Sequence, residues 1–317
     1  MKIKNKKAQI FSLIAITLIG LMFVSFEVYS AVDKRQTIGT RISSMESFLD
    51  SVESNLERQM YVSGYRIIFL AENQITTSGT YIGDVDDFFN EAFFNGTIYG
   101  VNDTILIGAT YGDIINSVNE KSKKINVDVT FSNPKFYVEQ TNPWYVRFTL
   151  ESDFLMKDKS GLAKWERMQN ISTMIPISGF EDPVYIINSN ARISKRFNQT
   201  IYEGNYVNGN DVTNLLSHVN NDYYAANINA PNFLQRLSGN LSADPNGFGI
   251  ESFVNTNKFI QEGIPVYDKS KIDYIYFDSG NNPSHNGVTG MPSWFRIDNT
   301  GINKTHFEKY NVSGITY

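Results

Sequence analysis

The pattern of apolar and polar positions divides the chain into a continuous apolar helix, amphipathic helices, alternating strands and a C-terminal part with sparse periodicity. The stretch Gln9–Phe26 carries no charged residue. As a helix that rises about 1.5 Å per residue, it reaches roughly 27 Å, close to the ~30 Å hydrocarbon core of a bilayer. Lysines precede it, and Glu27 and Asp33 follow. We therefore expect a membrane-spanning helix with the N-terminus in the cytoplasm and the later residues outside.

The helical pattern continues beyond the apolar stretch. Apolar residues recur at alternating spacings of four and three positions, which is a heptad pattern that we call the heptad seam: Ile38, Ile42, Met45, Leu49, Val52 and Leu56. This seam indicates either contact with helices of other subunits or packing on the chain's own globular domain, and the sequence leaves both open. After Met60, apolar residues lie on nearly all sides of the helix, which predicts burial. A break at Thr77–Thr80 predicts its end.

Helical and then strand signals follow the long helix. Asp84 is a favourable N-cap for an amphipathic helix that stops at Asn95-Gly96, and a short helix is expected around Asp113–Lys123. Three alternating runs then predict an antiparallel sheet with one wet face: 125–131, 144–150 and 171–177. Asn-Pro pairs at 133–134 and 142–143 are expected to separate the strands.

Regular periodicity is sparse in the C-terminal part. The segments Val184–Ile187 and Ile272–Phe277 predict strands, and Val212–Val219 and Asn232–Leu237 predict short helices. The segment Gly179–Pro183 precedes a change toward Asn, Tyr and Gly, and we expect a domain boundary there.

The predicted fold class is α+β. A long N-terminal helix, transmembrane and then extracellular, packs on an antiparallel sheet and is followed by an irregular, loop-rich distal α+β domain. The predicted parts are a basic leader at 1–8, a hydrophobic helix at 9–30, a helix extension at 31–77, a head domain at 78–179 and an Asn- and aromatic-rich distal domain at 180–317.

Composition narrows the possible chemistry. The net charge of −5 provides no basic stripe for nucleic acid, and the lack of cysteine removes disulfides, thiolate catalysis and cysteine-ligated zinc. His218, His285 and His306 share no metal-ligand spacing, and the sequence contains no nucleophile elbow, phosphate loop or dinucleotide fingerprint. We therefore predict no catalytic residue, no cofactor and no metal site. The acidic segments 244–251 and 278–282 are interpreted as tight turns rather than calcium loops.

Two features suggest chemistry at the outer surface. Seven Asn-x-Ser/Thr sequons are candidates for glycosylation, although an Asn-rich chain produces several by chance: Asn95, Asn102, Asn170, Asn198, Asn240, Asn303 and Asn311. The mixture of aromatic and polar residues in the distal part is either core with loops or a sugar-binding surface. For the second interpretation, Trp294, Tyr223 and Tyr224 are the candidate stacking residues.

The N-terminal motif resembles a known class of leader. Lys6-Lys7-Ala8-Gln9, followed at once by the apolar helix, looks like the class III signal peptide of archaeal type IV pilin-like proteins. The resemblance implies a cut between Ala8 and Gln9 by a prepilin-type peptidase, after which the helix serves as an anchor or as the core of a filament. Leu13 departs from the Glu of many bacterial pilins, and 317 residues is large for a major pilin, so a minor or tip component fits better.

Two other processing outcomes stay open. The helix can remain as an uncleaved anchor, or a secretory signal peptide can be cut before Ala31, because Val28-Tyr29-Ser30 loosely satisfies the small-residue rule. These outcomes predict different N-terminal residues for the mature protein.

The resemblance and the apolar helix together lead to the expected function. We expect a non-enzymatic, pilin-like cell-surface protein, a minor or tip component of a type IV-like filament with a role in adhesion. Its partners would be membrane lipid, other pilin-like subunits and, if it is processed, a prepilin-type peptidase. The alternative is a single-pass membrane receptor whose extracellular domain binds carbohydrate or another ligand.

Overall fold

The computed structural model describes residues 4–317 and confirms the predicted α+β class. The chain forms two compact units, each made of three segments. The first consists of the described part of Met1–Asn55 with Val118–Thr130 and Phe154–Arg167, and the second of Leu56–Ser117, Phe131–Asp153 and Met168–Tyr317. These units do not coincide with the boundaries expected at residues 78 and 180, which remain predictions. The first three residues of the expected leader lie outside the described residues.

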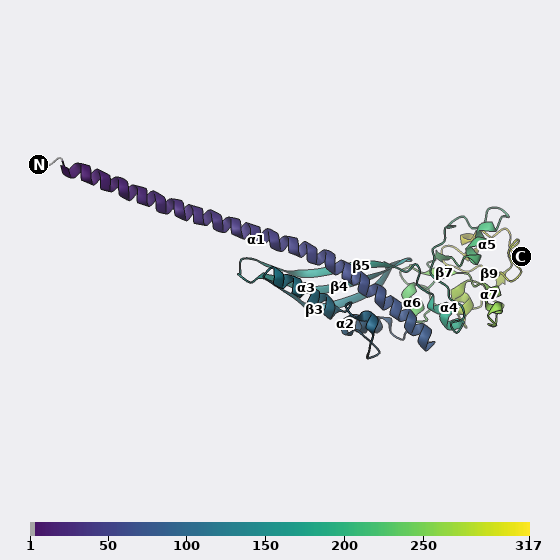
Figure 1. Cartoon of the computed structure of the whole chain (residues 1–317). Coiled ribbons are helices and arrows are strands. Elements are labelled where there is room, and N and C mark those ends of the chain that lie inside the picture. The colour runs from purple at the N-terminus through teal and green to yellow at the C-terminus, as the bar shows by residue number, and fades with distance from the viewer. Residues whose placement is uncertain (1–3) are drawn as a thin grey trace. The chain divides into compact units, whose positions relative to one another are not determined.

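The predicted long helix is a single element, α1, which runs from Lys4 to Ser78 without a break (Figure 1). It joins the apolar stretch and the helix extension as the sequence predicts. The helix ends where Gly79 adopts a φ of 65°, a left-handed conformation that glycine adopts without steric cost. Among the described residues, α1 is the one helix long and apolar enough to cross a membrane by length and composition, and no residue of its most apolar window is buried.

The elements after α1 follow the predicted capping signals. Helix α2 (Val85–Asn95) begins where the Asp84 side chain accepts a hydrogen bond from the Asp87 amide, and it ends at Gly96 in a left-handed conformation. A small hairpin follows (β1, Thr97–Ile98; β2, Val101–Asn102), then the 3₁₀ helix η1 (Thr104–Leu106) and helix α3 (Tyr111–Lys124). The two α-helices therefore confirm the predicted ones.

The three predicted strands are present and are longer than predicted. They are β3 (Val127–Asn142), β4 (Tyr145–Asp158) and β5 (Lys164–Pro176), in the order β3-β4-β5. The expectation that Asn133-Pro134 separates strands is wrong, because both residues lie inside β3. A proline has no amide hydrogen to donate, and this loss is tolerated in β3 because β3 is an edge strand. The backbone of β3 is also irregular beside the proline, where Asn133 has a φ of 51°.

Within the second unit, α1 packs closely on the sheet at Gly64. A Cβ atom at Gly64 would lie 2.5 Å from Cδ1 of Ile175 and 2.9 Å from Cδ2 of Phe148. The missing side chain therefore allows the helix to approach β4 and β5. The prediction that the helix is buried on all sides here is wrong, because one face is exposed, with the side chains of Tyr61, Val62, Tyr65 and Phe69.

The C-terminal part consists of short helices and two-stranded sheets joined by loops (Figure 1). The sheets are antiparallel and pair β6 with β7 and β8 with β9. The bounds are α4 (Pro183–Asn188), α5 (Thr213–Asn220), β6 (Tyr224–Ala226), α6 (Phe233–Leu237), β7 (Ile250–Ser252), α7 (Thr256–Gln261), α8 (Asp273–Phe277), β8 (His285–Asn286), β9 (Ile297–Asp298) and α9 (His306–Lys309). The predicted helices at 212–219 and 232–237 are confirmed as α5 and α6.

Two predicted strands in this part are helices instead. The segment Val184–Ile187 belongs to α4, which begins with Asp182 as N-cap and Pro183 in its first turn. The segment Ile272–Phe277 contains α8. Both runs are short, apolar and buried nearly all round, so they carry no alternation that distinguishes a helix from a strand.

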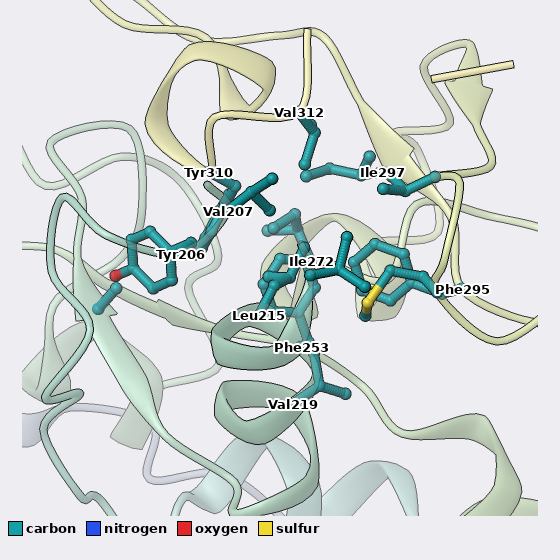
Figure 2. Packing of buried hydrophobic residues seen from close by; sticks show 14 of the residues in the cluster. Tyr206, Val207, Leu215, Val219, Phe253, Ile272, Phe295, Ile297, Tyr310 and Val312 are labelled. Atoms are coloured by element: carbon teal, nitrogen blue, oxygen red, sulfur yellow. The ribbon is translucent and has the colours of Figure 1, made fainter. Parts of the chain in front are cut away.

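An apolar cluster holds the last third of the chain together. Figure 2 shows side chains from α5, β9 and the loops between short elements converging on one another, with Phe253, Ile272 and Phe295 among them. Aromatic rings contact one another within it; the ring centroids of Phe253 and Tyr310 are 4.7 Å apart. Burial of these apolar side chains stabilises a part of the chain whose helices and strands are short.

Candidate functional site

A buried ion cluster fixes three of the short helices. Arg236 on α6 donates from Nη1 to Oδ2 of Asp182 at 2.6 Å and from Nη2 to Oδ2 of Asp273 at 3.1 Å, and all three side chains are fully buried. Burial alone would lower the pKa of Arg236, but the two carboxylates hold it above its ordinary value. The Tyr224 hydroxyl also donates to Asp182 at 2.8 Å. This cluster joins α4, α6 and α8 through buried ion pairs.

A second buried cluster surrounds Glu251 of β7. Its Oε1 accepts from Nζ of Lys309 at 2.6 Å and from the Tyr310 hydroxyl at 2.8 Å, and its Oε2 faces Nε2 of His306 at 3.1 Å. The other ring nitrogen of His306 is 2.8 Å from Oδ1 of Asp298. Although burial lowers the pKa of His306, the two carboxylates raise it to about 9, so the imidazole is charged at neutral pH.

This carboxylate–histidine–carboxylate arrangement resembles the parts of a proton relay, but it lies inside the core. Glu251 and Asp298 are fully buried, and His306 is nearly so. The pockets described below are not lined by any of the three. Among the described residues, no group of three or more acidic, histidine or cysteine side chains could hold a metal ion.

Two neighbouring pockets lie on the surface of the second unit. The first, which we call the aromatic pocket, has a volume of about 560 Å³ and is lined by Phe259, Tyr267, Tyr276 and Phe277 together with polar residues. The second, the amide pocket, has a volume of about 550 Å³. Asn188, Phe277 and Ser279 line both, so the pockets adjoin, and we refer to them together as the distal groove.

The wall of the aromatic pocket is built from packed rings and a clamped loop. The rings of Tyr276 and Phe277 are 5.3 Å apart, and that of Phe277 lies 5.1 Å from Tyr185. The Tyr267 amide donates to the Tyr276 hydroxyl at 3.0 Å, and the Tyr267 carbonyl accepts from Nζ of Lys271 at 2.8 Å. The backbone of Tyr267 is therefore held on both sides, while its side chain is 59% exposed.

The amide pocket is lined mainly by amide and hydroxyl side chains. Asn188 donates to the Val184 carbonyl at 2.8 Å and to the Tyr81 hydroxyl at 3.2 Å, so its amide oxygen remains available as an acceptor. The ring of Tyr81 lies against Gly239, where a Cβ atom would come within 2.6 Å of it. Gly239 also has a φ of 74°, so it is required both for space and for backbone conformation.

The residues of the heptad seam differ in their exposure to solvent. Met45, Leu49, Val52 and Leu56 are buried in the folded chain, whereas Ile38 and Ile42 are exposed. Beside Ile42, Arg41 donates from Nε to Oδ1 of Asp158 at 2.9 Å and from Nη2 to the Ile125 carbonyl at 2.6 Å, which fixes α1 to the other segments of the first unit. Four seam positions thus have no free surface for another subunit, and a role in assembly stays a prediction for Ile38 and Ile42.

The residues predicted to be glycosylated and those at the predicted cleavage site are accessible to solvent. All seven sequon asparagines are exposed, so none is prevented by burial from carrying a glycan. Ala8 and Gln9 are exposed and lie within α1. Glycosylation and cleavage at these positions remain predictions.

The residues predicted to bind sugar are not brought together at a site. Tyr224 is fully buried and bound to Asp182, so the proposed stacking role for it is wrong. Tyr223 and Trp294 are half-buried, and Trp294 packs against the apolar cluster; neither lines the distal groove. The sequence analysis did not identify the groove residues, because they come from segments that are far apart in the chain. The one signal for them in the sequence was the Asn-rich composition of the distal part.

Comparison of the chain with protein-family models, with curated proteins and with solved structures found no match in any of the three.

Proposed function

We propose that the chain is a pilin-like surface protein whose helix α1 anchors it in a membrane and, in an assembled filament, packs against α1 of neighbouring subunits. The observation that carries this proposal is the exposure of the apolar part of α1. Large apolar side chains between Ile10 and Val32 are more than half exposed with few exceptions, which is unfavourable in water. Lipid tails or the helices of other subunits would cover them.

The arrangement of α1 supports the same proposal. An N-terminal helix that is apolar at its start and packed on an antiparallel sheet further along, as at Gly64, is compatible with a pilin-like fold. The expected orientation, with the N-terminus in the cytoplasm and the sheet outside, rests on the lysines before the apolar stretch. We propose structural roles for the two buried ion clusters and assign no catalytic role.

The test places one positive charge on different faces of α1. Ile42 is 39% exposed, so Ile42→Lys should leave the fold intact and reduce assembly, measured as the cross-linked oligomers recovered from the cell surface. Gln36→Lys is the matched control, because Gln36 is exposed on another face of the same helix, about 120° around the axis from Ile42, and should assemble normally. Leu49→Lys buries a charge at a position that is 7% exposed and should destabilise the fold.

The three variants distinguish the hypotheses. If Ile42→Lys assembles as well as the Gln36→Lys control, the heptad seam does not contact other subunits. A loss of assembly in both would indicate a general effect of charge on α1 rather than a specific contact.

A second candidate function is that of a membrane-anchored binding protein, and the distal groove is the observation that favours it. Ligand sites in proteins are typically concave and combine apolar walls with a few polar groups, as this groove does. The two functions are compatible, since a filament tip can also carry a binding site.

A further inference from the structure

We propose that the distal groove binds a neutral oligosaccharide, with Tyr267 and Phe277 stacking on sugar rings and the surrounding amides binding their hydroxyl groups. This inference rests on the second candidate function and is independent of whether α1 assembles into filaments. It moves the sugar-binding site away from the residues that sequence composition suggested.

The size of the groove suits a short chain of sugars. Its two pockets measure about 560 and 550 Å³, each within the range of small-molecule sites. Phe277 and Asn188 line both pockets, so an extended ligand could cross from one to the other without leaving the surface. A compact single ring would fill only one of them.

The aromatic side chains provide the apolar part of the recognition. A pyranose ring carries C–H groups on its faces, and these are attracted to the electron-rich face of an aromatic ring. Tyr267 offers such a ring on a fixed backbone, because its amide donates to the Tyr276 hydroxyl and its carbonyl accepts from Lys271, while its side chain stays exposed. Phe277 is fixed by contacts with the rings of Tyr185 and Phe259.

The polar lining matches hydroxyl groups rather than charges. An asparagine side chain both donates and accepts hydrogen bonds, as a sugar hydroxyl does. The groove contains several such side chains, with two serines: Asn188, Asn190, Asn229, Asn240, Asn281, Ser242 and Ser279. Its charged residues are one of each sign, Lys269 and Asp278.

Anionic ligands are disfavoured by the same lining. Nζ of Lys269 donates to the carbonyl of Asp278 at 2.6 Å and to that of Asn281 at 3.3 Å, so two of its three N–H groups hold the loop, and the Asp278 side chain supplies a charge of opposite sign to the same groove. None of the described residues that line the groove is an arginine, which could bind a phosphate or carboxylate through two parallel hydrogen bonds. A neutral ligand rich in hydroxyl groups is the class that remains.

The test measures glycan binding by the full-length protein in lipid nanodiscs. Nanodiscs avoid maltoside detergents, whose sugar head groups would compete. The protein is produced in a host without N-glycosylation, because Asn240 lines the amide pocket and a glycan there would occupy it. The probes are a panel of neutral hexose and N-acetylhexosamine oligosaccharides, with sialylated and sulfated versions for comparison.

We expect neutral oligosaccharides to bind and Tyr267→Ala to weaken the best of them at least about tenfold. Asn281→Ala, at another exposed lining residue, should weaken binding several-fold. Tyr99→Ala is the matched control, because Tyr99 is 58% exposed, as Tyr267 is, but lies outside the groove. Its binding should equal that of the wild type.

Three results would overturn the proposal: no binding of any neutral oligosaccharide, equal binding by wild type and both groove variants, or a preference for the charged glycans. Unchanged thermal unfolding of the variants would show that a loss of binding comes from the groove. Binding by a protein that does not assemble would separate this inference from the filament proposal.

Discussion

At the scale of single residues, two histidines of the same domain are driven to opposite charge states by their surroundings. His306 lies between two carboxylates and is charged, with a pKa of about 9. His218 is fully buried among aromatic rings, and burial, reinforced by the charges of Lys195 and Lys309, lowers its pKa to about 3. A histidine has an ordinary pKa near 6.5, so each contributes to stability over a different pH range.

The stabilisation from His306 is fully present below pH 6.5 and is lost as the pH rises through about 9, because the folded state holds its proton more tightly than the unfolded state. For His218 the sign is reversed. The unfolded state binds a proton that the folded state excludes, so stability is present above pH 6.5 and is lost as the pH falls toward 3.

We predict that His218→Phe flattens the acid side of the stability profile. At pH 5 the unfolded state binds a proton at His218 and the folded state does not. This difference lowers the free energy of unfolding by about 2 kcal/mol relative to pH 7. Phe keeps the ring contacts with Tyr206 and Phe253 and loses the 2.9 Å hydrogen bond to Thr200 at every pH. Urea unfolding at pH 7 and pH 5, followed by tryptophan fluorescence, measures the difference; equal pH dependence in variant and wild type would contradict the prediction.

At the scale of elements, the close packing of α1 on the sheet depends on Gly64. Glycine in a helix interior costs about 1 kcal/mol relative to alanine, so its presence needs a reason. At Gly64 the reason is contact with Ile175 and Phe148, whereas Gly39 has open space around the position of a Cβ atom. Gly39 and Gly64 of α1 therefore lead to opposite predictions for the same substitution.

We predict that Gly64→Ala lowers the stability by about 1–3 kcal/mol, because the added methyl group overpacks the helix–sheet contact. Gly39→Ala should instead be neutral or stabilising by up to about 1 kcal/mol. Thermal unfolding of both variants under the same conditions provides the measurement. If Gly64→Ala were as stable as Gly39→Ala, the close approach of α1 to β4 and β5 would be wrong.

Elements with a long period or a clear cap could be predicted from the sequence, and short buried ones could not. The apolar run of α1, the Asp84 cap of α2 and the alternation of the sheet strands all carry local signals. Helix α4 begins at an Asp-Pro pair, which favours the start of a helix, but the sequence analysis interpreted these residues only as part of a domain boundary. Helix α8 has no side-chain cap, so its sequence had no such signal.

At the scale of the whole molecule, the residues that line the distal groove lie far apart along the chain, so the groove could not be predicted from the sequence. The apolar helix is one contiguous segment, so it could be predicted directly from the sequence. The distal groove joins Tyr81, Asn188, Phe259 and Phe277, which only folding brings together. Stacking candidates chosen by composition therefore included Tyr224, whose ring is fully buried.

The remaining prediction concerns the N-terminus of the mature protein and decides how α1 is used. We expect mass spectrometry of the membrane fraction to find Gln9 as the first residue, because Lys6-Lys7-Ala8 precedes the apolar helix as in a class III signal peptide. Substitution of Lys7 by Glu should then block the cut, while Lys34→Glu, beyond the apolar stretch, should leave it unchanged. A start at Met1 would indicate an ordinary anchor and favour the binding protein over the filament. A start at Ala31 would remove the apolar helix, and with it the physical basis for both membrane anchoring and helix bundling.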